Sequence, residues 1–393
     1  VSVEYTVTPE RQRGGGRSRG TVEGEGGTAV YTPGAGVVRG PAAAAAIIGP
    51  PPARAGARPV NTRVLFVKRP VGWVDETCFR VEPCDEPGCG PEDVLVQAGW
   101  LAGGPYLRGR MNEGPSYAPG FPLDRPVVSR VVGRVLASRN ARFAEGDFVW
   151  GFLDWALRSV VRRGEGLHRI DPSWPRPSLA ISALGMPGLT AWIGAIDLGR
   201  PNPGDTVYVS SAAGAVGQLA GQFAKRAGAR VVGSAGGPEK VAFLLERCGF
   251  DAAFDYRARD LDDALRETCP AGIDVYFDNV GGATLEAALR HANPRARFPV
   301  CGMISGYNET EDAGIRGLRL LVQKRITMTG FIIYDHVHEL PAYQARVAPW
   351  LRDGSLRFHE DLVHGIERAP AALIGMLKGE AIGKRLVQVA EPG

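Results

Sequence analysis

Cysteine is scarce in this chain, and the few cysteines present are badly spaced for holding a metal. The 393 residues include six cysteines, which do not make a disulfide framework in a chain of this length. Cys84 and Cys89 lie close together in the sequence. No Cys-x2-Cys pair and no matching histidine cluster accompanies them, as a zinc site would require. We therefore expect neither structural disulfides nor a bound metal.

Lysine is also rare, and the basic residues are not gathered into blocks. With six lysines, almost all of the positive charge falls on arginine, and the net charge at pH 7 is only +4. Beyond the first twenty residues there is no basic block. This pattern argues against a nucleic-acid partner.

Hydrophobic segments that could cross a membrane are missing as well. Two uncharged runs, residues 177–196 and 206–224, reach the necessary length, but Pro, Gly, Ser and Gln interrupt them where turns and βα units would need such residues. No apolar segment closely follows the N-terminal arginines, as a secretion signal would require. We expect a cytoplasmic protein with no membrane partner.

Residues 1–60 differ in composition from the rest of the chain. They contain a glycine run at 14–16, an alanine run at 42–46 and a proline run at 50–52, with scattered arginines and few large apolar side chains. No helical or strand periodicity is sustained there, so a packed core is not expected. This stretch is interpreted as a disordered extension or a misassigned start, and the alternative is an Arg-rich targeting peptide.

A β-rich region is expected from residue 61 to about residue 185. Segments 63–70, 93–102 and 127–138 read as strands, separated by Gly- and Pro-rich turns. Taken singly, the polar residues of this region suit a surface as well as a site. The candidates noted there are Tyr106, Arg108, Arg110 and Tyr117.

The second half of the chain alternates strands with helices, which predicts a doubly wound parallel sheet. In such a sheet the ligand binds outside the carboxyl ends of the strands, at the switch point beside the first strand. The expected strands are 206–210, 230–234, 252–255, 273–278, 297–302 and 326–333. The expected helices are 216–227, 238–247, 260–268 and 282–292.

A small-residue turn follows the first of these strands, in the sequence TVYVSSAAGAVG (206–217). Gly214 and Gly217 occupy the second and third glycine positions of G-x-G-x-x-G, and Ala212 occupies the first. Alone, this turn suits a tight βα connection as well as a phosphate loop. Within the predicted sheet it indicates a dinucleotide, held at the start of the helix. The predicted contacts are Ala213, Gly214, Ala215, Val216 and Gly217.

The second strand of the predicted sheet favours NADP(H) over NAD. An NAD site usually has Asp or Glu at the end of this strand to hold the ribose hydroxyls. Here the strand ends in Ser234-Ala235-Gly236-Gly237, and Lys240 follows, where it could neutralise a 2′-phosphate.

Several motifs together resemble those of a known family. They are PYLRGRMN (105–112), GMPGLTAW (185–192), the phosphate-loop segment, EKVAFL (239–244), YFDNVGG (276–282), CGMISGYN (301–308) and IGMLKGEAIGKRLVQV (374–389). The chain resembles the zinc-free branch of the medium-chain dehydrogenase/reductase superfamily that includes leukotriene B4 12-hydroxydehydrogenase, prostaglandin reductase and alkenal double-bond reductases. The resemblance covers residues 61–391.

The resemblance implies an α/β fold of two domains with the active site between them. A GroES-like catalytic domain would comprise residues 61–187 and 338–393, and a Rossmann NADP-binding domain residues 188–337. It also implies a small-molecule α,β-unsaturated carbonyl substrate and a homodimer.

The resemblance further assigns site residues. Lys240 and Tyr256 match residues at the adenosine phosphate. Tyr307 matches a tyrosine near the nicotinamide and the substrate carbonyl, where it would donate a hydrogen bond or order a water, with Tyr106 as a second candidate. Without the family, Asn279 and Tyr307 would be read as loop-capping and packing residues. The remaining expected cofactor contacts are Asn279, Cys301, Gly302, Ile304, Ser305, Phe331 and Gly383.

The activity implied by the resemblance is NADPH-dependent reduction of an enal or enone, with hydride delivered to the β-carbon. The chain departs from the family pattern in three places, with Gly104 where Asp is usual, Ala381 where Asn is usual and Pro299 in place of a strand residue. The alternatives are a non-catalytic or weakly active NADPH-binding relative, or a quinone reductase.

Overall fold

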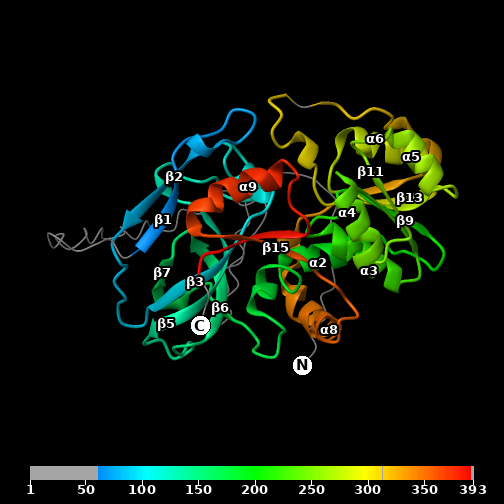
Figure 1. Cartoon of the computed structure of the whole chain (residues 1–393). Helices are drawn as coiled ribbons and strands as arrows, with labels where there is room; N and C mark the ends of the chain where they lie inside the picture. The colour runs from blue at the N-terminus through cyan, green and yellow to red at the C-terminus, as the bar shows by residue number, and fades with distance from the viewer. Residues whose placement is uncertain (1–60, 312, 391–393) are drawn as a thin grey trace, which may run out of the picture. The chain divides into compact units, whose positions relative to one another are not determined.

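The structure is a computed structural model that describes residues 61–390 apart from residue 312. The predicted N-terminal extension lies outside these residues. Within the described part, the strands form three sheets of three, six and seven strands (Figure 1). No helix of this part is long and apolar enough to cross a bilayer.

The first half of the chain forms most of two sheets, which are antiparallel except where the C-terminal strands β15 (Glu360–His364) and β16 (Lys384–Gln388) pair in parallel. The smaller has the order β2-β1-β4, and the larger has the order β15-β16-β3-β5-β6-β8, with β7 paired to β3. The strands are β1 (Asn61–Phe66), β2 (Phe79–Cys84), β3 (Val94–Ala102), β4 (Arg125–Pro126), β5 (Val128–Ser138), β6 (Phe148–Asp154), β7 (Arg158–Val161) and β8 (His168–Arg169). The predicted strands 93–102 and 127–138 correspond to β3 and β5.

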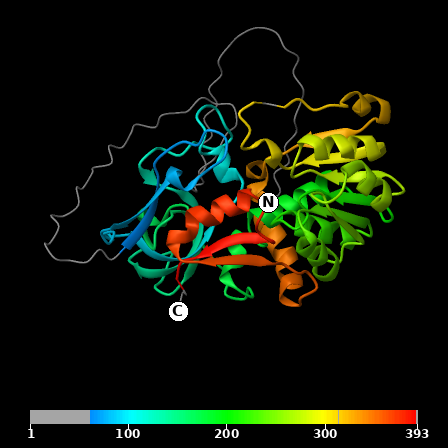
Figure 2. The ribbon, with the colours of Figure 1, turned by 45° about the horizontal axis from the view of Figure 1, so that its top comes forward.

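The apolar positions of these strands alternate and bury one face. In β3, Val94, Val96 and Ala98 point into a common core, as expected for a strand with one covered face. Leu373 of helix α9 (Ala369–Leu377) joins the same core from the C-terminal segment. Figure 1 and Figure 2 both show α9 beside the N-terminal strands.

The second half contains a six-stranded parallel sheet of order β11-β10-β9-β12-β13-β14. This order reverses direction at the first strand, so the predicted doubly wound sheet is confirmed. The strands are β9 (Thr206–Val209), β10 (Arg230–Ala235), β11 (Ala252–Asp255), β12 (Ile273–Phe277), β13 (Ala292–Val300) and β14 (Thr327–Gly330). The predicted strand 297–302 corresponds to β13, which starts earlier because the chain passes directly into it from helix α6 (Gly282–His291), and which ends at Val300.

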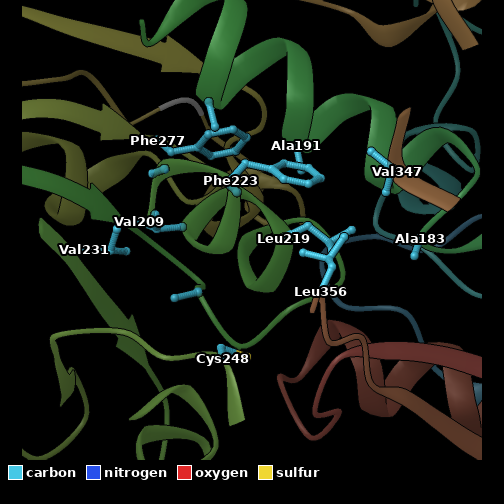
Figure 3. Close-up of a cluster of buried hydrophobic side chains, with 14 of the residues drawn as sticks. Ala183, Ala191, Val209, Leu219, Phe223, Val231, Cys248, Phe277, Val347 and Leu356 are labelled. Atoms are coloured by element: carbon cyan, nitrogen blue, oxygen red, sulfur yellow. The ribbon is translucent and has the colours of Figure 1, made fainter. Parts of the chain in front are cut away.

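Helices cover both faces of the parallel sheet. They are α2 (Met186–Trp192), α3 (Gly217–Arg226), α4 (Pro238–Ala242), α5 (Leu261–Thr268), α6 (Gly282–His291), α7 (Arg319–Lys324) and α8 (Leu340–Arg352). The two other α-helices of the described residues, α1 (Tyr106–Gly109) and α9 (Ala369–Leu377), belong to the core of the antiparallel half. Val207 and Val209 pack toward α2 and α3 on one face, whereas Tyr208 packs toward α5 and α6 on the other. Figure 3 shows Phe223 and Leu219 of α3 within the first of these cores.

The C-terminal segment contacts both sheets in turn. In α8, the Tyr343 hydroxyl donates to the Ala183 carbonyl at 2.7 Å, and the helix belongs to the core around α2 and α3. Strands β15 (Glu360–His364) and β16 (Lys384–Gln388) then extend the larger sheet of the first half as a parallel pair, and Leu386 of β16 lies opposite Ala102 of the antiparallel strand β3. The C-terminal residues therefore pass along the carboxyl end of β9 on their way to β3.

Candidate active site

The turn after β9 has the shape that a phosphate loop needs. A Cβ added at Gly217 would lie 2.6 Å from the Ser211 carbonyl oxygen, so no other residue fits without a shift. The amides of Ala215, Val216 and Gly217 donate no backbone hydrogen bond to another described residue. Free amides at the start of a ten-residue helix fit a pyrophosphate.

A second segment closes over this loop from the C-terminal part of the chain. The Gly383 amide donates to the Ala213 carbonyl at 2.7 Å, and Gly383 also forms a bridge with Gly214. Gly383 has φ +76°, and a Cβ there would lie 2.3 Å from the His359 carbonyl oxygen. Glycine is therefore required at the point where β16 approaches the phosphate loop.

Two cations gather at the end of β10, where a ribose-binding acid would stand in an NAD site. The Lys240 ammonium donates to the Gly379 carbonyl at 2.5 Å, and burial, followed by the nearby Arg257 charge, lowers its pKa. Arg257 donates to the Lys378 carbonyl at 3.3 Å. A Cβ at Gly236 would lie 2.8 Å from Arg257 Nε and 3.1 Å from the Tyr256 hydroxyl. This corner therefore fits a 2′-phosphate.

The loops that follow β12 and β13 are joined along their length. The Asn279 side chain donates to the Ser210 carbonyl at 2.8 Å, which ties the first loop to the end of β9. The Ile304 amide donates to the Asn279 carbonyl at 3.3 Å, and the Ser305 hydroxyl to the Val280 carbonyl at 2.6 Å. Asn279, Ile304 and Ser305 are thus brought together at the carboxyl edge of the sheet.

Asp278, which lies next to Asn279, is buried and forms hydrogen bonds that hold these loops together. Its carboxylate accepts hydrogen bonds from the Tyr276 hydroxyl at 2.7 Å and from the Gly281 amide at 2.8 Å. Burial raises the pKa of Asp278. The Cys301 amide donates to the Asp278 carbonyl at 2.8 Å. The sequence motif FDNVGG contained this residue, but its role as a buried anchor depends on contacts that only the fold reveals.

Cys301 and Phe331 lie at the inner side of these loops. Burial raises the pKa of the Cys301 thiol to about 12, so it stays protonated near neutral pH and is a poor nucleophile or metal ligand. The Phe331 ring lies against the helix region at Gly194, where an added Cβ would meet it at 2.9 Å. Both residues therefore supply packing and shape at this end of the site.

Tyr307 ends the short 3-10 turn Ile304–Gly306 and folds back over its own loop. A Cβ at Gly302 would lie 3.2 Å from the Tyr307 hydroxyl oxygen, so Gly302 leaves space for the phenol. Burial raises the pKa of Tyr307. The hydroxyl therefore stays protonated at neutral pH and is available as a hydrogen-bond donor beside the predicted cofactor loop.

Tyr117 has three other tyrosines from separate elements as neighbours, and we call Tyr106, Tyr117, Tyr307 and Tyr334 the tyrosine cluster. The rings of Tyr117 and Tyr334 lie 6.2 Å apart. Burial raises the pKa of Tyr117 to about 12, with Tyr307 the next contributor. The cluster combines phenols from the antiparallel half and from the loops of the parallel sheet.

Tyr106 differs from the others because its hydroxyl is enclosed. Burial raises the pKa of Tyr106, and its hydroxyl has no hydrogen-bond partner among the described residues. Its ring takes the space beside Gly104, where an added Cβ would lie 3.0 Å from the ring atoms. Tyr307 is therefore better placed than Tyr106 to meet a substrate.

The sequence did not single out Arg257, Tyr334 or Arg130 as site residues, and judged Tyr117 only a polar candidate. Arg257 follows Tyr256 directly in the sequence DYR (255–257), so it could have been predicted as a second basic residue at the phosphate corner. Tyr334 and Arg130 meet only through the fold, with the guanidinium 5.7 Å from the ring centroid. No spacing in the sequence could predict that contact.

The described residues contain no group of three or more His, Cys, Asp or Glu side chains that could hold a metal ion. The predicted absence of a metal stays a prediction.

Comparisons with known proteins agree with this architecture. Residues 62–170 match the family described as the N-terminal domain of oxidoreductase, and residues 215–348 match the family described as zinc-binding dehydrogenase. The chain is 43% identical over 304 residues to the NADP⁺-dependent 2-alkenal reductase of Nicotiana tabacum, covering 77% of this chain and 88% of that protein. It is 38% identical over 336 residues to the NADPH-dependent curcumin reductase of Escherichia coli K12, covering 84% and 97%.

A solved structure shows the same fold. The NADPH complex of CurA from Vibrio vulnificus superposes with a TM-score of 0.80 at 38% identity, covering 84% of this chain and all of that one. The chain belongs to the medium-chain dehydrogenase/reductase superfamily. Within it, the chain falls in the branch of the alkenal and prostaglandin reductases, since it is also 36% identical over 324 residues to prostaglandin reductase 1 of Bos taurus, covering 81% of this chain and 96% of that protein.

Proposed function

We propose that this NADP-dependent oxidoreductase reduces the carbon–carbon double bond of α,β-unsaturated aldehydes and ketones. The observation that carries the proposal is the position of Tyr307. Its phenol shares one short loop with the predicted cofactor contacts Gly302 and Ser305, so that one segment serves both cofactor and substrate. The relatives named above for alkenal and curcumin reduction support the same chemistry.

The residues of the chain divide the binding of NADP(H) among three segments. Lys240, Arg257 and Tyr256 would hold the 2′-phosphate, and the free amides of 215–217 the pyrophosphate. Bound NADPH supplies the hydride. The loops that carry Asn279 and residues 301–305 would orient the nicotinamide end.

Tyr307 would stabilise the charge that develops on the substrate. As hydride reaches the β-carbon, the π electrons of the double bond move to the carbonyl oxygen, and a proton added at the α-carbon completes the saturated product. A protonated phenol beside the carbonyl oxygen lowers the barrier, because it is already oriented toward the charge that forms. A tyrosine is already protonated at neutral pH, and burial raises the pKa of this phenol further.

A substrate panel tests the proposal. The full chain is incubated with NADPH and a set of enals, enones and quinones, and the loss of the reduced nicotinamide absorbance is followed. We expect turnover of enals and enones and a loss of about 10²-fold in kcat for Tyr307→Phe. Quinone turnover alone would support the quinone reductase alternative. NADPH binding without any turnover would support a non-catalytic relative.

The division into domains is also proposed, with a first boundary at 187/188. The packing of Tyr343 and Leu356 into the core around α3 favours a second boundary after Leu356. We further propose a cytoplasmic homodimer, on the strength of the family resemblance.

A further inference from the structure

A buried arginine without a counter-ion lies beside the tyrosine cluster. Arg130, on β5, is 8% exposed, and its guanidinium lies 4.6 Å from the Phe152 ring centroid. Among the described residues it forms no ion pair, and its Nε has no hydrogen-bond partner. A guanidinium keeps its charge, so it cannot escape burial by losing a proton. The charge therefore calls for an anion.

A second buried cation reinforces the first. Lys384, at the start of β16, is 5% exposed, and its ammonium donates to the Gly103 carbonyl. Burial, together with the Arg130 charge, lowers the pKa of Lys384 to about 7. The two cations therefore share one neighbourhood and repel each other.

The described part of the chain offers these cations no free carboxylate. Glu360 acts on Lys384, but its carboxylate already accepts from Arg176 Nε at 2.8 Å and from the Ser178 hydroxyl at 2.8 Å. A side chain at position 104 would begin 3.8 Å from Lys384 Nζ, and Gly104 supplies none. The missing anion would have to come from a ligand.

The position of Arg130 indicates what kind of molecule would supply this anion. Its guanidinium lies 5.7 Å from the Tyr334 ring centroid, and Tyr334 lies 6.2 Å from Tyr117. Tyr307 in turn raises the pKa of Tyr117, so these two phenols are neighbours. An anion held by Arg130 would therefore belong to a molecule that also meets the tyrosines around the proposed reaction centre.

We propose that the preferred substrates of this reductase carry a carboxylate remote from the enone, and that Arg130 binds it. This inference rests on the proposed function and narrows its substrate class. The planar fork of a guanidinium matches the two oxygens of a carboxylate, which makes arginine the usual partner for this group. The nearby Lys384 adds to the positive potential around Arg130.

Matched substrates test the inference. Straight-chain enones of several lengths that end in a carboxylate are compared with their methyl esters, and kcat/KM is measured for each pair with NADPH. We expect wild type to prefer the acid by at least about tenfold at the best length. Arg130→Met, which keeps an unbranched apolar stem but removes the guanidinium and its charge, should bring the acid-to-ester ratio close to one.

Arg110 provides a matched control. It also lies over an aromatic ring, 4.2 Å from the Phe121 centroid, but it donates to the Pro119 carbonyl at 2.9 Å and to the Val128 carbonyl at 3.1 Å. Arg110→Met should therefore leave the acid-to-ester ratio as it is in wild type. Thermal unfolding of Arg130→Met checks its fold, and we expect a melting temperature no lower than that of wild type, because an unpaired buried charge is lost.

Binding separates this inference from the proposed function. Calorimetric titration of the saturated keto acid and its ester into the full chain with NADP⁺ should show tighter binding of the acid, and this preference should be lost in Arg130→Met. Turnover of esters with no preference for acids would overturn the inference and leave the reductase standing. Preferential acid binding without turnover of any pair would support the inference and overturn the reductase. A third outcome is that the keto acid and its ester bind equally well, while acetate alone stabilises wild type but not Arg130→Met. This result would show that Arg130 binds an anion from solution, and it would also overturn the inference.

Discussion

At the scale of the residue, the preference for NADP(H) over NAD(H) depends on two cations at the end of β10, Lys240 and Arg257. Gly236 keeps the ribose corner free of carboxylates and of bulk, and Arg257 and Tyr256 lie within van der Waals reach of its missing Cβ. Lys240 is held at the same corner by the Gly379 carbonyl. A 2′-phosphate gains charge-assisted hydrogen bonds here that NADH cannot form.

Lys240→Ala should therefore weaken NADPH binding by about 10- to 100-fold, the loss of one charge-assisted hydrogen bond, and leave NADH binding nearly unchanged. Arg257→Ala should act in the same direction. Fluorescence titration with both cofactors measures the effect. Lys225→Ala is the control, since Lys225 pairs with Asp251 at 2.7 Å and lies outside this corner. Equal loss for both cofactors would refute the phosphate assignment.

Lys384 gives a second prediction at this scale, in the pH dependence of stability. Its pKa falls from 10.5 to about 7 on folding because the side chain is buried. Between pH 7 and 10.5 the unfolded chain binds the extra proton, so the free energy of unfolding should rise with pH in that window, by as much as about 4 kcal/mol from this group. Below pH 7 this group contributes no pH dependence.

Urea unfolding of wild type and Lys384→Met at a series of pH values isolates the contribution of this amine. The difference in stability between the two proteins should favour the variant most below pH 7 and shrink as the pH rises. A difference that is constant across the window would mean that Lys384 titrates normally.

At the scale of the element, one buried arginine joins three segments around the substrate end of the site. Arg108, in α1, is 3% exposed, and all three nitrogens of its guanidinium donate hydrogen bonds. It donates to Asn308 Oδ1 at 2.9 Å, to Asn112 Oδ1 at 2.5 Å and to the Gly72 carbonyl at 2.8 Å. Because Asn308 follows Tyr307 directly, this contact sets where the Tyr307 loop lies against the antiparallel half.

Arg108→Lys should lower kcat by about tenfold or more while changing NADPH affinity little, because one ammonium cannot replace three directed bonds. Asn308→Ala should lower kcat in the same way, since it removes only the bond to the Tyr307 loop. Steady-state kinetics measure kcat, and cofactor titration measures the affinity for NADPH.

Arg69→Lys is the matched control for these variants. Arg69 bridges the Met111 and Phe121 carbonyls at 3.0 and 3.2 Å, within the antiparallel half alone. Its replacement should cost stability without changing kcat. If Arg108→Lys and Arg69→Lys had the same kinetics, Arg108 would be merely structural.

At the scale of the whole molecule, the sequence predicted the parallel sheet well and the substrate end poorly. Strand and helix periodicity is local, so β9 to β12 and α3, α5 and α6 were predicted to within a few residues. The phosphate loop could also be predicted from the sequence, because its backbone must approach the pyrophosphate closely and only small residues allow this. The contacts of Arg130 and Tyr334 join positions 204 residues apart, 130 and 334, and depend on how the two sheets pack.

The central claim is that this chain adds hydride to the β-carbon of a conjugated carbonyl. Its most direct test uses NADPH deuterated at the transferred position, a simple enone and nuclear magnetic resonance of the product. The account predicts a saturated ketone with deuterium on its β-carbon. An allylic alcohol with deuterium on the carbinol carbon would contradict it.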